Sequence, residues 1–426
     1  MKLAVVTYGT EGDTRPLAAL GRALMDAGHQ VHLLADASTL HSAAALGIPA
    51  SPLSGDIRAA LAPGEALSNA VSRHGGFQNT SRALATIANT NTPAWMREVA
   101  DASEGCEALI VSGLAAFVGL SVAEYRGIPA IGTGLIPITP TADFASPFLP
   151  PDKVPRWLNR SSHRMVNGLL WQAFRKTTNA ARADVCGLPP RKRVWTEHPM
   201  IYGVSPSLLP RPDDWPANAF VCGQWSSAPA AWTPPPALED FLAVGEAPIY
   251  IGFGSMAGFD RAKLADALIT AIAGRRALFY PGWSGIDAAS LPENFFVLGE
   301  TPHHWLFPRT STVIHHGGSG TTHSAARAGI PSVVVPFAGD QPFWAERLRQ
   351  AGVAGEPVTG RRLQASVLAQ GIAFAQRPEV LDRARKLGEK MALEDGLGNA
   401  VGAIEQLVDA ARRGSADEKK GLRRIP

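Results

Sequence analysis

Cysteine is scarce in this 426-residue sequence, and long apolar runs are missing. The three cysteines, Cys106, Cys186 and Cys222, lie far apart and form no CxxC pair. This spacing excludes a disulfide framework and a cysteine-based zinc site, and it favours a reducing compartment. No apolar stretch reaches the roughly eighteen residues that a membrane span needs, and the run from Leu3 to Thr7 is too short for a signal peptide. We therefore expect a cytoplasmic protein.

A surplus of charge is lacking as well. The chain has 40 basic and 37 acidic residues, which gives a formal net charge of +3. A nucleic-acid-binding domain gathers Lys and Arg on one surface, and no dense basic block appears before the C-terminal tail. Nucleic acid is therefore not an expected partner.

The sequence does contain a repeated alternation of short apolar runs and amphipathic segments. A strand is predicted over Leu3 to Thr7 and another over Val31 to Ala35. Between them, Leu17, Leu20 and Leu24 recur at helical spacing. Strand, helix, strand is the βαβ unit of a parallel sheet. In the second half of the chain the same pattern predicts strands over Ile249–Phe253, Ala277–Tyr280, Phe295–Leu298, Val313–His315 and Ser332–Val335.

A proline-rich stretch divides the chain. Residues 226–236 include three consecutive prolines, which cannot join a helix or a central strand. We predict an N-terminal domain over 1–225, a linker over 226–245, a second domain over 246–400, and a C-terminal helix and tail over 401–426. Two Rossmann-like α/β domains with parallel sheets would face a central cleft at the carboxyl ends of their strands.

A glycine-rich turn follows the strand that ends at His315. Glycines let the backbone approach a ligand, and free N–H groups at the start of the next helix bind anionic oxygens. Hydroxyl and imidazole groups add further donors, so the turn has the chemistry of a diphosphate site. The glycines alone fit a tightly packed βα turn that binds nothing equally well. The residues in question are His316, Gly318, Ser319, Gly320 and Thr321.

Asp340 and Gln341 stand at the carboxyl end of the next predicted strand. A carboxylate accepts hydrogen bonds and an amide both donates and accepts, so the pair suits neighbouring hydroxyls of a sugar. Taken alone, the pair fits a helix N-cap better.

The segment from His315 to Gly352 resembles the donor-binding signature of the family 1 glycosyltransferases of GT-B fold. Its surroundings are similar to the sterol glucosyltransferase branch of that family. The resemblance covers nearly the whole chain, densely over 249–352 and thinly over 40–105. The further segments that carry it are Pro137–Thr141, Ile249–Ser255, Gly282–Gly285, Pro302–Pro308 and Gly339–Trp344.

The resemblance implies transfer of a hexose from a nucleoside diphosphate sugar, UDP-glucose or alternatively a dTDP sugar, with no other cofactor. It makes 1–225 the acceptor-binding domain and 246–400 the nucleotide-sugar-binding domain. It places Asp340 and Gln341 on the sugar hydroxyls. Trp283 fits a core aromatic better than a ligand contact, and His315 is interpreted as structural. The remaining donor-binding residues that it implies are Thr10, Ser255, Trp283, His303, His316, Gly318, Ser319, Gly320 and Thr321.

The loop from Gly9 to Pro16 carries the candidate general base. On its own, Asp13 before Pro16 reads as a helix-starting residue. In sterol-type and glycopeptide-type relatives, however, a Gly-(Ser/Thr)-Arg-Gly-Asp loop has its base at this position, so the resemblance implies that Asp13 is catalytic. Plant members use a His with a helper Asp, and Ser112 stands where that helper would fall.

Two positions of this loop depart from the relatives. Glu11 replaces their Arg, and Arg15 occupies a position that is often Gln or Glu. The exchange could preserve a local ion pair, or it could give Glu11 a different partner. Glu11 is therefore the alternative base.

The resemblance implies a single displacement with inversion at the anomeric carbon. The chain contains no Asp-x-Asp motif, so we expect the reaction to be metal-independent, with no metal site. The expected acceptor is the hydroxyl of a sterol, lipid or polyketide-type product, bound by apolar segments within 65–200. Apolar residues around 144–171 would also allow peripheral membrane contact. We expect a monomer or a homodimer.

Two other functions remain open at this point. A nucleotide-sugar-modifying enzyme of the same fold, such as a 2-epimerase, would keep the donor half without a large apolar acceptor domain. A non-catalytic partner would keep the fold and lose the site. A dinucleotide oxidoreductase is disfavoured, because no GxGxxG motif follows the first strand of either half.

Overall fold

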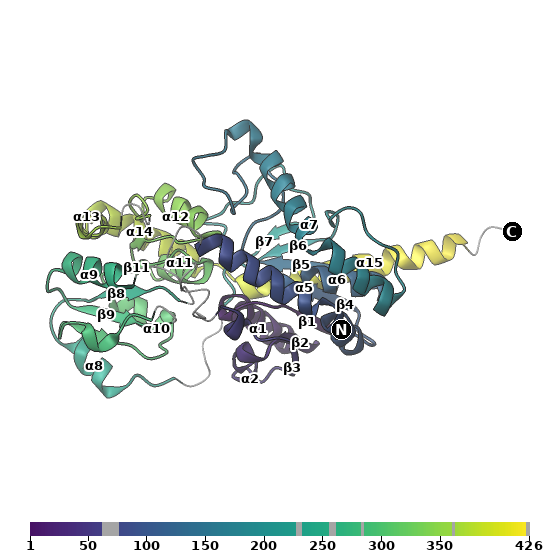
Figure 1. Ribbon diagram of the computed structural model, residues 1–426, viewed down its shortest axis with the longest axis horizontal. Helices are drawn as coiled ribbons and strands as arrows, with labels where there is room; N and C mark the ends of the chain where they lie inside the picture. The colour runs from purple at the N-terminus through teal and green to yellow at the C-terminus, as the bar shows by residue number, and fades with distance from the viewer. Residues whose placement is uncertain (62–75, 227–231, 255–260, 283–284, 360–362, 423–426) are drawn as a thin grey trace.

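The structure of the chain is a computed structural model with two parallel β-sheets and surrounding helices (Figure 1). It describes residues 1–61, 76–226, 232–254, 261–282, 285–359 and 363–422. Residues 227–231 of the predicted linker lie outside this part of the chain. The α/β class with two parallel sheets is confirmed, whereas the exact domain boundaries stay predictions.

The N-terminal sheet has the strand order β3-β2-β1-β4-β5-β6-β7, and the second sheet has the order β10-β9-β8-β11-β12. In each sheet the order reverses beside the first strand, between β1 and β4 and between β8 and β11. Ligands bind at the carboxyl ends of strands that flank such a reversal. The strands are β1 Lys2–Val6, β2 Gln30–Asp36, β3 Ala50–Leu53, β4 Ala108–Val111, β5 Ala130–Gly134, β6 Met200–Tyr202, β7 Ala219–Val221, β8 Ile249–Gly252, β9 Ala277–Tyr280, β10 Phe295–Val297, β11 Thr312–His315 and β12 Ser332–Val334.

The central strands are buried along their whole length because helices cover both faces of each sheet. All four residues of β4 are buried, and so are all four residues of β11. Continuous burial is the property that distinguishes a parallel sheet from a half-exposed antiparallel one. The five strands predicted for the second half of the chain are confirmed, with ends that differ by one residue.

The helices fill the connections between the strands. No helix within the described ranges is both long enough and apolar enough to cross a membrane. Their bounds are α1 Glu11–Asp26, α2 His41–Ala44, α3 Ile57–Leu61, α5 Gly76–Ala102, α6 Ala116–Arg126, α7 Asn159–Cys186, α8 Pro236–Ala243, α9 Arg261–Ile272, α10 His303–Leu306, α11 Ser319–Arg327, α12 Gln341–Gln350, α13 Ala365–Ala375, α14 Pro378–Ala392 and α15 Gly396–Leu422.

The last helix, α15, returns to the N-terminal sheet. Ala400, Val401, Ile404 and Val408 recur at helical spacing and are buried in the same apolar core as Leu17 of α1. Burial of such side chains stabilises a fold by about 1.5–3 kcal/mol each for Val and Ile. In Figure 1 the helix, in yellow, runs along this sheet and projects beyond it. The predicted C-terminal helix is confirmed, and it begins at Gly396 and continues to Leu422.

The two halves of the chain touch at backbone level. A Cβ on Gly223 would lie only 2.7 Å from the Cα of Gly396. The two backbone segments therefore leave no room for a side chain at either glycine. Trp225 Nε1 donates to the carbonyl of Gly396 at 3.1 Å, and Gln224 Nε2 donates to Ser324 Oγ of α11 at 3.1 Å. These contacts fix the loop after β7 against the second domain.

Candidate active site

A capping box opens α1 at the carboxyl end of β1. The backbone N–H of Thr10 donates to Asp13 Oδ2 at 2.9 Å, and Thr10 Oγ1 lies 3.4 Å from the same oxygen. Each group satisfies a polar atom of the other, which stabilises a helix start at this point. The prediction that residues 9–16 form a loop ahead of the helix is therefore wrong in part, because α1 already begins at Glu11.

Asp13 is solvent-exposed, and yet the protein around it raises the pKa of its carboxyl group. Desolvation causes the rise and outweighs the two hydrogen bonds from Thr10, which lower the pKa. The two observations agree if the carboxylate lies in a cleft, where protein displaces part of the surrounding water and leaves a path to the solvent. In the described part of the chain, only Oδ2 has a hydrogen-bond partner, which leaves Oδ1 open.

Glu11 is held by three neighbours. Ser42 Oγ donates to its Oε2 at 2.7 Å, Arg15 lies 3.3 Å from the same oxygen, and His41 Nε2 lies 3.2 Å from Oε1. The exchanged charges of this loop therefore do form an ion pair with each other. With its carboxylate tied to α1 and α2, Glu11 is placed to support the helix start rather than to receive a proton.

His316 lies between two glycines at the turn after β11. A Cβ on Gly318 would lie 2.5 Å from His316 Nε2, and one on Gly254, after β8, would lie 3.0 Å from its Cε1. His315 and Gly252 pair across β11 and β8, which brings these turns together. Burial lowers the pKa of His316 to about 4, so the ring is neutral at pH 7. An interaction with the Gly252 backbone opposes this fall in the pKa, while the buried Nδ1 has no hydrogen-bond partner of good geometry among the described residues.

Two other histidines beside the turn are also neutral. His315 is buried, its pKa is lowered by burial to about 3, and its Nδ1 accepts a hydrogen bond from the Gly317 N–H at 3.1 Å. It therefore shapes the turn, as its structural interpretation requires. His303 stacks on Phe307 with ring centres 4.3 Å apart. Burial and then the positive charge of Arg15 lower the pKa of His303 to about 4.

The N-terminus of α11 faces the first domain. Gly318 is its N-cap residue and Ser319 its first residue, so the helix begins directly after the glycine pair. Gly320 has open space around it, and Thr321 is half-buried. A small pocket of about 20 Å³, space for about one water molecule, joins the two domains here. It is lined by Pro16, Leu135, Gly203, Gln224, Trp225, Ser319, Gly320 and His323.

Asp340 and Gln341 begin α12 at the carboxyl end of β12. Asp340 occupies the N-cap position, but its Oδ2 accepts a hydrogen bond from Trp344 Nε1 at 2.8 Å instead of capping the backbone. Burial raises its pKa to about 6, and the charge of Asp13 adds to the rise. Gln341 Oε1 accepts hydrogen bonds from the N–H groups of Phe337 and Ala338, at 2.7 and 3.0 Å, and so holds the preceding loop.

Three further positions were singled out in the sequence, namely Ser112, Ser255 and Trp283. Ser255 and Trp283 lie outside the described residues, so their predicted donor contacts stay predictions. Ser112 follows β4, and its N–H donates to the carbonyl of Val6 at 2.9 Å. It therefore stands beside the end of β1, on the same edge of the sheet as the α1 start.

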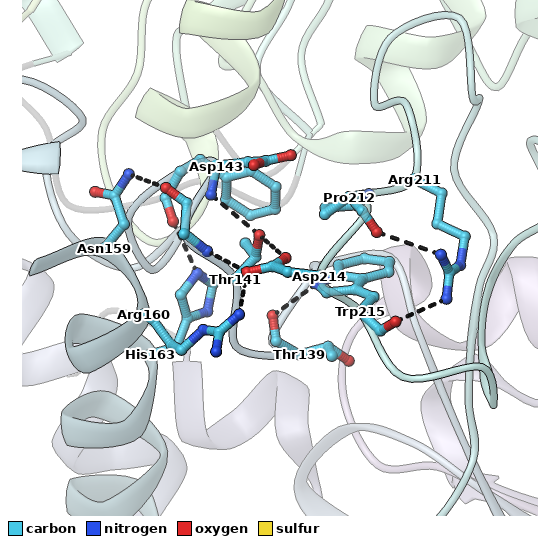
Figure 2. A network of polar contacts seen from close by, with 12 residues as sticks. Thr139, Thr141, Asp143, Asn159, Arg160, His163, Arg211, Pro212, Asp214 and Trp215 are labelled. Carbon is cyan, nitrogen blue, oxygen red and sulfur yellow. Dashed lines mark hydrogen bonds and ion pairs between the residues drawn. The ribbon is translucent and has the colours of Figure 1, made fainter. Parts of the chain in front are cut away.

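A polar network fixes the Pro137–Thr141 segment after β5 (Figure 2). Thr141 Oγ1 donates to Asp214 Oδ1 at 2.6 Å, and Arg160 pairs with the other oxygen of that carboxylate. Although desolvation opposes it, these hydrogen bonds lower the pKa of Asp214 to about 2. Trp215 Nε1 donates to the carbonyl of Thr139 at 3.1 Å. The segment is thus held rigidly beside the cleft.

The apolar segments expected to line an acceptor pocket point in different directions. Phe144 packs against Phe343 of α12 with ring centres 5.2 Å apart, and Trp171 is 3% exposed in the core. Trp157 and Leu169 instead face solvent, with 81% and 57% of their surfaces exposed. Within the described ranges these side chains do not share one pocket, and residues 65–75 of the expected region lie outside those ranges.

A larger cavity of about 440 Å³ lies elsewhere. Its wall includes Pro129 and Ala130 at the start of β5, and Pro199 just before β6. These are the amino ends of the strands, at the opposite edge of the sheet from Asp13. The candidate catalytic and binding residues lie beyond the carboxyl ends of the strands and do not line this cavity. Cavity size is therefore a poor guide to the candidate site.

Sequence reasoning missed several residues at this site. Gln224 and Trp225 line the small pocket but precede the proline-rich stretch without a motif of their own. His323 donates from Nδ1 to the carbonyl of Ser319 at 2.7 Å. The four-residue spacing of Ser319 and His323 on a helix was the one signal that could have found this contact.

Comparison with known proteins supports one family across the chain. Residues 278–406 match the model described as Erythromycin biosynthesis protein CIII-like, C-terminal domain. A sterol 3-beta-glucosyltransferase of Arabidopsis thaliana is 31% identical over 421 residues, which cover 95% of this chain and 68% of that protein. The O-mycaminosyltylonolide 6-deoxyallosyltransferase of Streptomyces fradiae is 32% identical over 431 residues, covering 95% and 97% of the two chains.

Solved structures share the fold. The glycosyltransferase VinC, solved in complex with dTDP, superposes with a TM-score of 0.64 at 18% identity and covers 97% of this chain and 100% of its own. The spinosyn forosaminyltransferase SpnP has a TM-score of 0.68 at 16% identity, covering 96% and 99%. Fold and sequence relatives therefore agree over almost the full length, and the chain belongs to the family 1 glycosyltransferases of GT-B fold, with a C-terminal domain of the Erythromycin biosynthesis protein CIII-like type.

Proposed function

We propose that this glycosyltransferase moves a hexose from UDP-glucose to a hydroxyl group of a sterol-like or other apolar natural product, with inversion and without a metal ion. One observation carries the proposal. The charge of Asp13, beyond the carboxyl end of β1, reaches Asp340, beyond the carboxyl end of β12, and His316 directly follows the neighbouring strand β11.

Asp13 acts as the general base. The acceptor oxygen forms a bond to the anomeric carbon as the bond from that carbon to the phosphate oxygen breaks. The hydroxyl proton passes to Asp13 Oδ1, which has no partner among the described residues. The raised pKa of Asp13 makes it a better base than an ordinary carboxylate, and its exposure lets the proton reach solvent afterwards.

The departing diphosphate carries away the electron pair of the broken bond, and its charge must be stabilised. The first turn of α11 offers free N–H groups and the positive end of a helix dipole. His316 is neutral, so in the tautomer with hydrogen on Nδ1 it donates to a phosphate oxygen. Arg15 supplies a permanent cation, since its charge reaches both His303 and Tyr280 on the far side of the cleft.

Asp340 is the sugar-binding carboxylate of the proposal. With a pKa near 6 it is mostly ionised at pH 7, and it can accept hydrogen bonds from sugar hydroxyls. The hydrogen bond from Trp344 fixes its orientation, while Gln341 holds the loop beside it. The positions of both side chains support a role in donor binding.

The choice of sugar and acceptor follows the relatives, and UDP as the carrier of the sugar follows the sequence resemblance. The Arabidopsis relative is named for glucose transfer to sterols, and the Streptomyces relative for 6-deoxyallosyl transfer to O-mycaminosyltylonolide. The absence of an Asp-x-Asp motif supports metal independence. A dTDP sugar is the alternative donor, because VinC was solved with dTDP.

The test is a mass-spectrometric screen of UDP- and dTDP-sugars against sterols, carotenoids and macrolides, with and without EDTA. We expect a glycosylated product from UDP-glucose, with inverted anomeric configuration, whether or not EDTA is present. Loss of product with EDTA would contradict metal independence. Conversion of the nucleotide sugar without an acceptor would indicate the 2-epimerase alternative, and UDP binding without any turnover would indicate a non-catalytic partner.

A further inference from the structure

Large apolar side chains are exposed on one short segment of the N-terminal domain. This segment consists of η3, Arg156–Leu158, and the first half of α7. Trp157 is 81% exposed, Leu169 57%, Met165 53% and Leu170 39%. Met165 and Leu169 are four residues apart on a helix and so lie on one face. A soluble protein rarely gathers such side chains without a partner for them.

The same segment is strongly basic. From Lys153 to Ala183 the sequence contains seven Lys and Arg residues and no Asp or Glu. Arg182 is buried and Arg160 pairs with Asp214, so these two serve the fold. The others include four exposed residues for which no acidic partner is found in the described part of the chain. They are Arg156, Arg164, Arg175 and Lys176.

The segment is both prominent and firmly held. In Figure 1 the start of α7 and the loop before it extend away from both sheets, at the top of the view. The network of Figure 2 holds the start of α7 in place. Asn159 donates to the carbonyl of Ala142, and Arg160 donates to Asp214. A rigid projection can press its tip against a flat surface without a loss of folded structure.

We propose that this segment docks on an anionic lipid bilayer. Its apolar side chains enter the interface between headgroups and acyl chains, and the basic residues around them bind lipid phosphate groups. Anionic lipid attracts each nearby Lys or Arg, whereas an apolar protein partner gains nothing from four unpaired cations. Charge therefore favours a membrane over another protein as the occupant. The inference does not depend on the proposed donor or acceptor.

Sedimentation with sucrose-loaded vesicles tests it, using the full chain without any substrate. We expect the protein to pellet with phosphatidylcholine vesicles containing phosphatidylglycerol, and to pellet much less with phosphatidylcholine alone. The combined variant W157S/M165S/L169S should bind at least about fivefold less, as the loss of three inserted side chains implies. R156Q/R164Q/R175Q should lose the preference for the anionic vesicles.

Leu393→Ser is the matched control, because Leu393 is 89% exposed on the other domain and should not affect binding. Absence of wild-type binding, or equal binding by W157S/M165S/L169S, would overturn the proposal. A lower melting temperature of this variant with unchanged vesicle binding would show that the chain itself covers the patch. A dimer that the same substitutions convert to a monomer, with no vesicle binding, would assign the patch to a second copy.

Discussion

Asp13 and Asp340 belong to different domains, and the negative charge of Asp13 adds to the rise that burial causes in the pKa of Asp340. When the charges of two carboxylates interact, each makes ionisation of the other less favourable. A sugar bound between them would separate them and give each a hydroxyl group as hydrogen-bond donor. The pair therefore links donor binding to the charge state of the base, and this relationship underlies the first two predictions.

Replacement of Asp13 by Asn should lower the transfer rate by roughly 10²- to 10⁴-fold, the usual contribution of a general base. Asn still accepts the hydrogen bond from Thr10, so the helix start and UDP affinity should persist. In the wild type, the rate should fall as pH drops through a value above the ordinary Asp pKa, because the pKa is raised and only the ionised form accepts a proton. Asp26→Asn on the same helix is the control, and a rate within threefold of the wild type for D13N would remove Asp13 as base.

Replacement of Asp340 by Asn should stabilise the protein at pH 8 and weaken donor binding. The pKa of Asp340 is raised in the folded state, so its ionised form costs folding free energy, and this cost grows from about pH 4 to about pH 6. Asn is neutral at every pH, so the melting temperature of D340N should exceed that of the wild type by about 2–5 °C at pH 8. The difference should shrink at pH 4.5. A lower melting temperature for D340N at pH 8 would contradict the assigned burial effect.

Glu11→Gln should retain turnover within a few-fold of the wild type. The carboxylate is held by Ser42, Arg15 and His41, and the ion pair with Arg15 is largely exposed. Exposed pairs contribute only about 0–1 kcal/mol, so the loss of stability should also be small. Steady-state kinetics beside the Asp13→Asn variant distinguish the two carboxylates. A collapse of activity in E11Q alone would make Glu11 the base.

His316→Ala should weaken UDP affinity by about tenfold, the value of one hydrogen bond to a charged group. Since its pKa is near 4, the ring is neutral throughout pH 6–8, and the ratio of affinities between wild type and variant should not change over this range. Calorimetric titration at several pH values measures both effects. The exposed neighbour His304→Ala is the control. A ratio that rises steeply toward pH 6 would mean that a charged imidazolium binds the phosphate.

Arg15→Gln should weaken UDP affinity several-fold and leave uridine affinity unchanged, because only the diphosphate carries charge. Higher salt should narrow the difference, as screening reduces the effect of an exposed cation. Arg22→Gln, at a partly exposed arginine further along α1 that pairs with Asp26, should behave as the wild type. Equal UDP binding by R15Q and the wild type would leave the diphosphate without a cation from this helix.

The sequence predicted the local features well and the contacts between distant segments poorly. The glycine turn at His316 was predictable because a run of β-branched residues leads directly into glycines there. Its clamp between Gly254 and Gly318 was not, because that depends on the pairing of β8 with β11. The early start of α1 was readable from the Thr10-x-x-Asp13 spacing, a capping-box pattern that the proline obscured.

No local sequence pattern predicts the effect of the Arg15 charge on His303 or of the Asp13 charge on Asp340. They follow from how two domains dock, which no segment of either domain encodes alone. The apolar segments of the N-terminal domain show the same limit. Leu169 and Trp171 are two residues apart, and helix geometry sends one to the solvent and the other into the core. Composition alone could not separate a pocket wall from an exposed patch.

The return of α15 to the first sheet decides how chimeric enzymes of this chain can be built. A cut in the linker alone would exchange the first 225 residues and leave the old helix facing a new partner. The side chains of Ala400, Ile404 and Val408 would then meet a surface that did not evolve with them. A recombinant that exchanges acceptor preference should therefore transplant residues 396–422 together with the N-terminal half, keeping Gly396 opposite Gly223.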